Sequence, residues 1–291
     1  MNETKTFKIK YLPRLLVDTG KAWLNGEPFQ LSAIVAYYAV LSLPALVIII
    51  LKVVGAVWGE EIVRGELLGE ISGAIGADAA DAIKTMIENQ SGEKTSVFAT
   101  VIGIGTLLYG STGVFFQLQS ALDKIWEQEP AYKNDFVATL MSRVKSFGFI
   151  LILGFLLLTS FVLTSLLSTF SRQLNRFLPD NLFDYLFVVD FLVSLTFIYV
   201  LFATMFKYLP SAKISWKSVR SGAALTTLMF LIGKYLLALY FNTMEPGSTY
   251  GAAGSIILIM LWVSYSCLIL LFGAHFTKQY AKRFVKNDHI S

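Results

Sequence analysis

Long apolar runs separated by short polar segments dominate the chain of 291 residues. An apolar run of about 20 residues is long enough to cross the hydrocarbon core of a bilayer as an α-helix. We expect spanning helices at residues 29–54, 95–118, 147–169, 184–207, 221–242 and 254–276. The pattern therefore predicts an all-α, polytopic membrane protein with six transmembrane helices, whose membrane domain is residues 29–276.

The N-terminal segment, residues 1–28, is basic and amphipathic. Apolar side chains recur at helical spacing from Leu12 to Trp23, Pro13 suits the first helical turn, and Asn25-Gly26 suits its end. These features predict a short helix that lies on the cytoplasmic surface of the membrane. A disordered tail with a few apolar residues is the alternative.

Residues 55–94 are different, because acidic side chains alternate with apolar ones that repeat every three or four positions. This spacing predicts an amphipathic helical cap outside the bundle, with a break near residues 73–76. The acids are scattered and have no histidine beside them, so they do not form a metal-binding pattern.

Composition agrees with a membrane protein, since 55% of the residues are hydrophobic and only 15% are charged, against about 25% charged in soluble domains. Of the 24 Lys and Arg residues, 17 fall in the N-terminal segment, loop 119–146, the connection 207–220 and the basic tail 277–291. Six fall on the other side. The positive-inside rule then places both termini in the cytoplasm and the cap outside. Topology accounts for the net charge of +4, so we expect no nucleic-acid partner.

Two ionisable side chains lie inside predicted spans, Asp190 in 184–207 and Lys234 in 221–242. Counted from the outer boundary at 1.5 Å per residue, they lie at similar depths of about 9 and 12 Å. Unpaired charges there are costly and mark functional sites, so we expect the two to pair or to share a water-filled cavity. Lone snorkelling to the outer surface is the alternative. The tyrosines that we expect to line such a cavity are Tyr37, Tyr38, Tyr109 and Tyr235, although tyrosines packed between helices have the same signature.

Several proline, glycine and tyrosine residues have predicted structural roles. Pro44 should kink the first span, and Gly110 should permit close helix packing. Tyr250 and Gly251 belong to the corner that joins the last two spans. Gly251 and Gly254 should permit close packing of the last span against a neighbour.

The sequence argues against an enzyme. It has two histidines, His275 and His289, and one cysteine, Cys267. No metal-ligand set, Ser-His-Asp set or nucleotide-binding loop is visible, so we expect no cofactor and no metal. His275, near the end of the last span, is interpreted as a packed or interfacial histidine, with a proton relay as the alternative.

Short motifs in a fixed order cover almost the whole chain. They are Ala36-Tyr37-Tyr38 with Ser42 and Pro44, Leu122-Asp123-Lys124-Ile125-Trp126, Tyr208-Leu209-Pro210 with Trp216, Gly222-Ala223, Ser248-Thr249-Tyr250-Gly251-Ala252, Trp262 and Gly273-Ala274. In this set the chain resembles the YihY/BrkB family of bacterial inner-membrane proteins. It departs from the family at Asp123, where the family often has Asn, and at His275, where the family often has an acid.

The resemblance implies a six-helix inner-membrane protein connected with envelope biogenesis and lipid transport. An old label, ribonuclease, is also attached to the family. We therefore expect a transporter or flippase-like carrier of an anionic amphiphile or lipid, with membrane lipids as partners. A structural or assembly scaffold without transport is the alternative, and the sequence leaves homo-oligomerisation open.

Overall fold

The computed structural model describes residues 9–75, 77–90, 112–128, 183–244 and 254–285. Regular structure in this part of the chain is entirely helical, as predicted. A 3₁₀ turn, Ile9–Tyr11, precedes the helices α1 (Leu12–Asn25), α2 (Pro28–Trp58), α3 (Glu60–Ile75), α4 (Ala77–Gln90), α7 (Phe183–Tyr208), α8 (Trp216–Met244) and α9 (Gly254–Phe284). Residues 112–125 are also helical.

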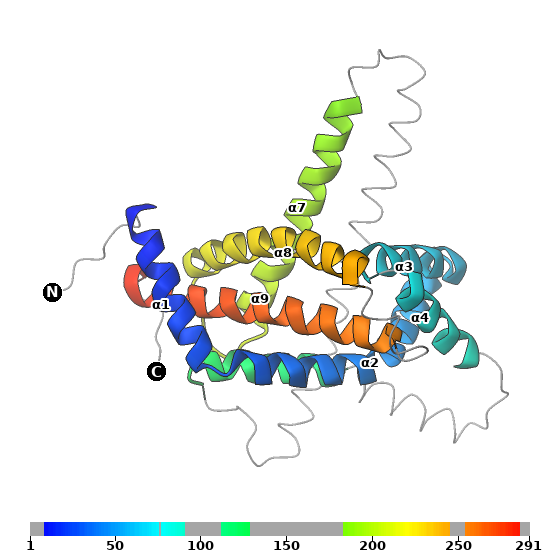
Figure 1. Cartoon of the computed structure of the whole chain (residues 1–291), viewed down its shortest axis with the longest axis horizontal. Coiled ribbons are helices and arrows are strands. Elements are labelled where there is room, and N and C mark those ends of the chain that lie inside the picture. The colour runs from blue at the N-terminus through cyan, green and yellow to red at the C-terminus, as the bar shows by residue number, and fades with distance from the viewer. Residues whose placement is uncertain (1–8, 76, 91–111, 129–182, 245–253, 286–291) are drawn as a thin grey trace.

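Three long helices, α2, α8 and α9, run side by side along the molecule, and α9 lies at the centre (Figure 1). α9 packs against α1, α2, α3, α4 and α8, and α7 packs against α8. α1 lies at one end of this bundle and the pair α3 and α4 at the other, while the N-terminal half of α7 leaves the bundle (Figure 1). That residues 55–94 form a cap outside the membrane stays a prediction.

α1 forms where the sequence predicts it. Pro13 lies in its first turn, and the N–H of Gly26 closes its end by donating to the carbonyls of Ala22 and Trp23. Leu15 and Thr19 are fully buried and the helix packs on α9, whereas Val17 and Leu24 are exposed. The periodicity identified the helix, and its location on the cytoplasmic surface of the membrane stays a prediction.

α2 is longer than the predicted span 29–54 and continues on both sides of Pro44. The predicted break in the cap is confirmed, since α3 ends at Ile75 and α4 begins at Ala77. The two cap helices are fixed to the bundle by an apolar cluster in which Val63 and Ile83 meet α2 and the first turns of α9.

Two of the described helices are long and apolar enough to cross a membrane, with spans at Trp216–Phe241 and Ile256–Phe284. Shorter apolar stretches lie in α2, at Pro28–Ser42, and in α7, at Leu192–Tyr208. The structure thus supports a membrane protein, but it does not confirm six spans. Residues 95–111 of one predicted span and all of 147–169 lie outside the described residues.

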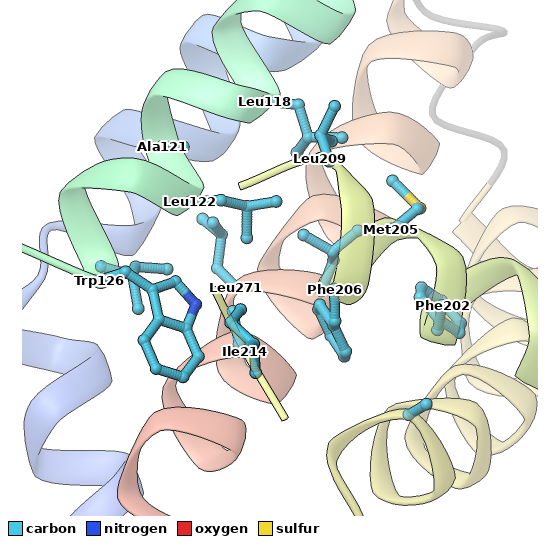
Figure 2. Packing of buried hydrophobic residues seen from close by; sticks show 14 of the residues in the cluster. Leu118, Ala121, Leu122, Trp126, Phe202, Met205, Phe206, Leu209, Ile214 and Leu271 are labelled. Carbon is cyan, nitrogen blue, oxygen red and sulfur yellow. The ribbon is translucent and has the colours of Figure 1, made fainter. Parts of the chain in front are cut away.

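The main apolar core joins α2, the 112–125 helix, α7, α8 and α9, and Figure 2 shows part of it. Leu122 lies on the 112–125 helix and Trp126 directly follows it, and both pack with Ile214 and Leu271 (Figure 2). Phe206, at the end of α7, is 1% exposed and belongs to the same cluster. This core brings together most of the motifs that carry the resemblance, although they are far apart in sequence.

Candidate functional site

α8 and α9 approach each other through a reciprocal pair of glycines and threonines. A Cβ built on Gly222 of α8 would lie 1.7 Å from Oγ1 of Thr277, and a Cβ built on Gly273 of α9 would lie 1.8 Å from Oγ1 of Thr226. Each threonine hydroxyl donates to the glycine carbonyl one turn earlier in its own helix, at 2.7 Å. Small residues therefore bring these two backbones into direct contact, as is common between membrane helices.

The same interface continues at Gly233, where an added Cβ would lie 2.1 Å from the Tyr265 hydroxyl of α9. Because successive helical residues are rotated by about 100°, the residue after Gly233 lies on the flank of α8 rather than facing α9. That residue is Lys234, and it is exposed. Tyr235 beside it is 69% exposed, in a row of exposed apolar side chains that includes Leu236 and Leu239.

Lys234 forms no bond with any side chain that the structure describes. Asp190 lies in α7, but its side chain is outside the described part, so the predicted pairing of the two stays a prediction. Tyr37 is 56% exposed, and its ring meets the half-buried Tyr38 edge-on at 5.5 Å between centroids. Tyr38 in turn faces Gly113 of the 112–125 helix.

The remaining predicted residues divide into two groups. Gly254 is buried at the start of α9 and Pro44 lies within α2. Tyr109, Gly110, Tyr250 and Gly251 lie outside the described residues, so their predicted roles stay predictions.

A polar cluster that the sequence did not predict occupies the α1 end of the bundle. Asp123 is buried, and it accepts two hydrogen bonds from Ser211, from the backbone N–H at 2.6 Å and from the hydroxyl at 2.9 Å. Burial raises the pKa of the Asp123 carboxyl above its usual value, and the two bonds from Ser211 act in the opposite direction. The carboxylate thereby fixes the loop between α7 and α8 to the 112–125 helix.

Two ion pairs join the same end of the bundle to α2 and α9. Lys124 reaches Glu27 at 2.7 Å, and Lys278 reaches Glu127 at 2.8 Å. The Lys278 ammonium also donates to the Ile125 carbonyl. The neighbouring lysines hold the pKa of each glutamate below its usual value, mainly through the hydrogen bond. A third pair, between Asp18 and Arg283, ties α1 to α9.

His275 is packed at this end rather than open to a water-filled path. It is 8% exposed, and a Cβ on Gly26 would lie 2.8 Å from its Nε2 atom. The imidazole therefore fills the corner between α1 and α2. This location favours the packed interpretation of the histidine over the proton relay.

The sequence flagged some residues of this cluster without assigning their contacts. Asp123, Trp126 and Gly273 belong to the motifs that carry the family resemblance. The order of these motifs along the chain was the sequence signal that pointed to them. Glu27 and Glu127 had no such signal, because their partners are supplied by segments far away in sequence. Among the described residues, no group of three or more His, Cys, Asp or Glu is placed to hold a metal ion.

The chain is similar to one protein family and to several bacterial proteins. A family model described as virulence factor BrkB matches residues 21–290. A UPF0761 membrane protein of Idiomarina loihiensis is 25% identical over 61% of this chain, an alignment that spans 60% of that relative's own length. A UPF0761 membrane protein of Haemophilus influenzae is 24% identical over 87% of this chain and 90% of its own length. A putative ribonuclease-like protein, YfkH of Bacillus subtilis, is 28% identical over 40% of this chain and 46% of its own length. No solved structure matches.

Proposed function

Because the chain belongs to the BrkB family of membrane proteins, we propose that it is a multi-pass protein of the bacterial inner membrane that carries an anionic amphiphile or lipid between leaflets. In this proposal both termini are cytoplasmic. The location of α1 and the basic end of α9 at one end of the bundle, opposite the cap, supports that orientation (Figure 1).

The observation that carries the proposal is the exposed Lys234 inside a membrane-spanning helix. It lies seven residues before the end of the span at Phe241, about 10 Å along the helix. A charge inside the bilayer costs about 2.5–3.5 kcal/mol on insertion scales. A cation kept there on an exposed face, beside Tyr235, is suited to meet the headgroup of an anionic lipid as it crosses.

The same lysine would also be present if it only snorkelled to the outer interface. The two interpretations differ in charge selectivity. A snorkelling lysine has no effect on lipid movement, whereas a headgroup contact accelerates anionic lipids alone.

A lipid-translocation assay separates them. The purified chain is reconstituted into phosphatidylcholine vesicles with a fluorescent phosphatidylglycerol, and translocation is followed by dithionite quenching. We expect wild-type protein to accelerate translocation, Lys234→Arg to retain the effect, and Lys234→Gln to lower it about fivefold, as for removal of one surface charge contact. Arg14→Gln, an exposed cation on α1, is the matched control and should leave the rate unchanged.

Equal rates for wild type and Lys234→Gln would contradict the proposal. So would equal acceleration of a fluorescent phosphatidylcholine, because the assigned contact is to a negative headgroup.

An assembly scaffold is the second candidate, and the tight α8–α9 contact favours it. A rigid hairpin with an exposed apolar outer face is suited to bind another membrane protein or a second copy of this chain. Cross-linking of Leu236→Cys in a Cys267→Ser background, in native membranes, would support the scaffold if a specific dimer formed while the translocation assay was negative.

We do not propose ribonuclease activity. The name of the Bacillus relative includes that activity, but the described residues of this chain offer no metal-binding group on which such a mechanism can be built.

A further inference from the structure

The cytoplasmic half of α8 has one continuous exposed side, which we call the outward stripe. Its members are spaced four residues apart, so they form one row that is inclined about 26° to the helix axis and turns about 40° around the helix at each step. They are Trp216, Arg220, Ala224, Leu228 and Ile232, all exposed. Cationic and aromatic side chains begin the stripe and apolar side chains continue it.

The beginning of the stripe is strongly positive. Lys213, Lys217 and Arg220 are exposed, and none of them is in an ion pair with a described side chain. The sequence has no Asp or Glu between residues 191 and 244. Asp123 of the 112–125 helix approaches the same connection, and both of its carboxylate oxygens are bonded to Ser211.

This positive region is held in a fixed shape. The Lys207 ammonium donates to the Ile214 carbonyl and lies 5.7 Å from the centroid of the Trp216 ring. The exposed Tyr208 ring meets Trp216 edge-on at 6.2 Å. Leu209 and Ile214 are buried at the two ends of the loop. Cations placed only for membrane topology need no such support.

The length of the stripe matches one leaflet. Twelve residues separate Arg220 from Ile232, about 18 Å along the helix, and half of a typical hydrocarbon core is about 15 Å. Trp and Tyr side chains favour the level of the headgroups. A lipid whose headgroup lies at Trp216 would therefore place an acyl chain along Ala224, Leu228 and Ile232.

We propose that the outward stripe of α8 is a binding site for an anionic phospholipid of the leaflet at the α1 end of the bundle. Its phosphate is bound by Lys217 and Arg220, and its headgroup contacts the Trp216 ring. An acyl chain covers the apolar part of the stripe. This site is distinct from Lys234 and does not depend on lipid transport by the chain.

Lipid titration of the delipidated protein tests the site, with binding followed by native mass spectrometry. We expect phosphatidylglycerol to bind about tenfold more tightly than phosphatidylethanolamine, because one lipid is anionic and the other zwitterionic. The double variant Lys217→Gln with Arg220→Gln should weaken phosphatidylglycerol binding about fivefold for each charge removed. The matched control, Lys10→Gln in the 3₁₀ turn with Arg14→Gln on α1, removes the same charge at the same end of the bundle and should bind as the wild type does.

Trp216 supplies a second readout that does not depend on the double variant being folded. Brominated phosphatidylglycerol should quench the tryptophan fluorescence of wild-type protein more than that of Trp216→Phe, whereas Trp262→Phe should retain the full quenching. Equal affinity for the two lipids, an equal loss from the two double variants, or unchanged quenching in Trp216→Phe would overturn the proposal.

Discussion

Two glutamates hold backbone conformations that glycine and asparagine usually take. Glu27 has φ 55° and Glu127 has φ 56°, and such left-handed positions cost about 1 kcal/mol or more for other residues. Each lies at a helix boundary, where the conformation directs its carboxylate at a lysine from another segment. The charge-assisted bond offsets part of the strain.

Glu127 allows this balance to be measured. Glu127→Gln should lower the free energy of unfolding by about 1 kcal/mol, since solvent screens a pair whose glutamate is 64% exposed. The folded-state pKa of Glu127 lies below its ordinary 4.5. The ion pair therefore contributes its full stabilisation above the ordinary pKa of 4.5. This stabilisation is lost as the pH falls through the lowered pKa of the folded state.

Thermal unfolding in detergent from about pH 7 to pH 3 checks the prediction. The variant should approach the wild type at acid pH. Glu88→Gln, on the exposed side of α4, is the control, and an identical loss in both variants would argue against a specific Glu127 contact.

Asp123 gives the opposite pH dependence. Its pKa is raised above 3.8 by burial, so the folded state holds its proton more readily than the unfolded state, and stability falls as the pH rises through this window. Asp123→Asn keeps an oxygen for the Ser211 N–H, so it should unfold close to wild type at neutral pH and lack this dependence.

Asp123→Ala should instead cost about 1–3 kcal/mol, because it removes both hydrogen bonds from Ser211 to a charged acceptor. Chemical denaturation of both variants at neutral pH compares them. Equal destabilisation by Asn and Ala would show that the charge, rather than the hydrogen bond, is what matters at this position.

At the scale of elements, the α8–α9 pair depends on the absence of side-chain atoms. Gly222 and Gly273 are the positions of closest approach, and each faces a threonine whose hydroxyl is bonded within its own helix. Because each hydroxyl already has its hydrogen-bond acceptor within its own helix, the two helices contact each other here through van der Waals packing. The apolar periodicity of one helix cannot predict such a contact, because the contact depends on the register between two helices.

Gly273→Ala should destabilise the protein by about 1–3 kcal/mol through overpacking against Thr226 and Phe206. The combination with Thr226→Ala should recover part of the loss, because it removes the atom in closest contact. Gly20→Ala on α1 is the control. Nothing lies within 4 Å of its added Cβ, so it should be neutral or stabilising. A loss at Gly20 as large as that at Gly273 would contradict packing as the cause.

At the scale of the whole molecule, the sequence predicted what depends on local pattern. α1, the break between α3 and α4, and the helical hairpin α8 and α9 all follow from apolar spacing and from residues such as Pro13. The burial of Leu15 on α9 and the bonding of Asp123 to Ser211 join distant segments, and apolar spacing carries no signal for them. The sequence marks Lys234 as unusual because it is a charged residue well inside a predicted membrane span. Whether Asp190 lies beside it depends on the tertiary structure.

Topology is the prediction at this scale. In a Cys267→Ser background, Glu88→Cys on the cap should react with an impermeant maleimide added to intact spheroplasts, and Lys10→Cys should react only after lysis. The reason is the basic excess at the α1 end. Labelling of both positions from the same side would contradict the proposed orientation.

The central position of α9 has a consequence for the order in which the protein is made. Every helix that packs on α9, from α1 to α8, is synthesised before it. During translation the glycine face of α8 therefore has no α9 to pack against until the chain is nearly complete. Leu15 of α1 likewise has no α9 surface to bury it. The bundle therefore cannot close helix by helix as the chain emerges, because its central helix comes last. A ribosome stalled before residue 254 leaves a chain that lacks α9. A chain terminated there should be degraded rapidly in a pulse-chase experiment, whereas one terminated after Phe284 should persist.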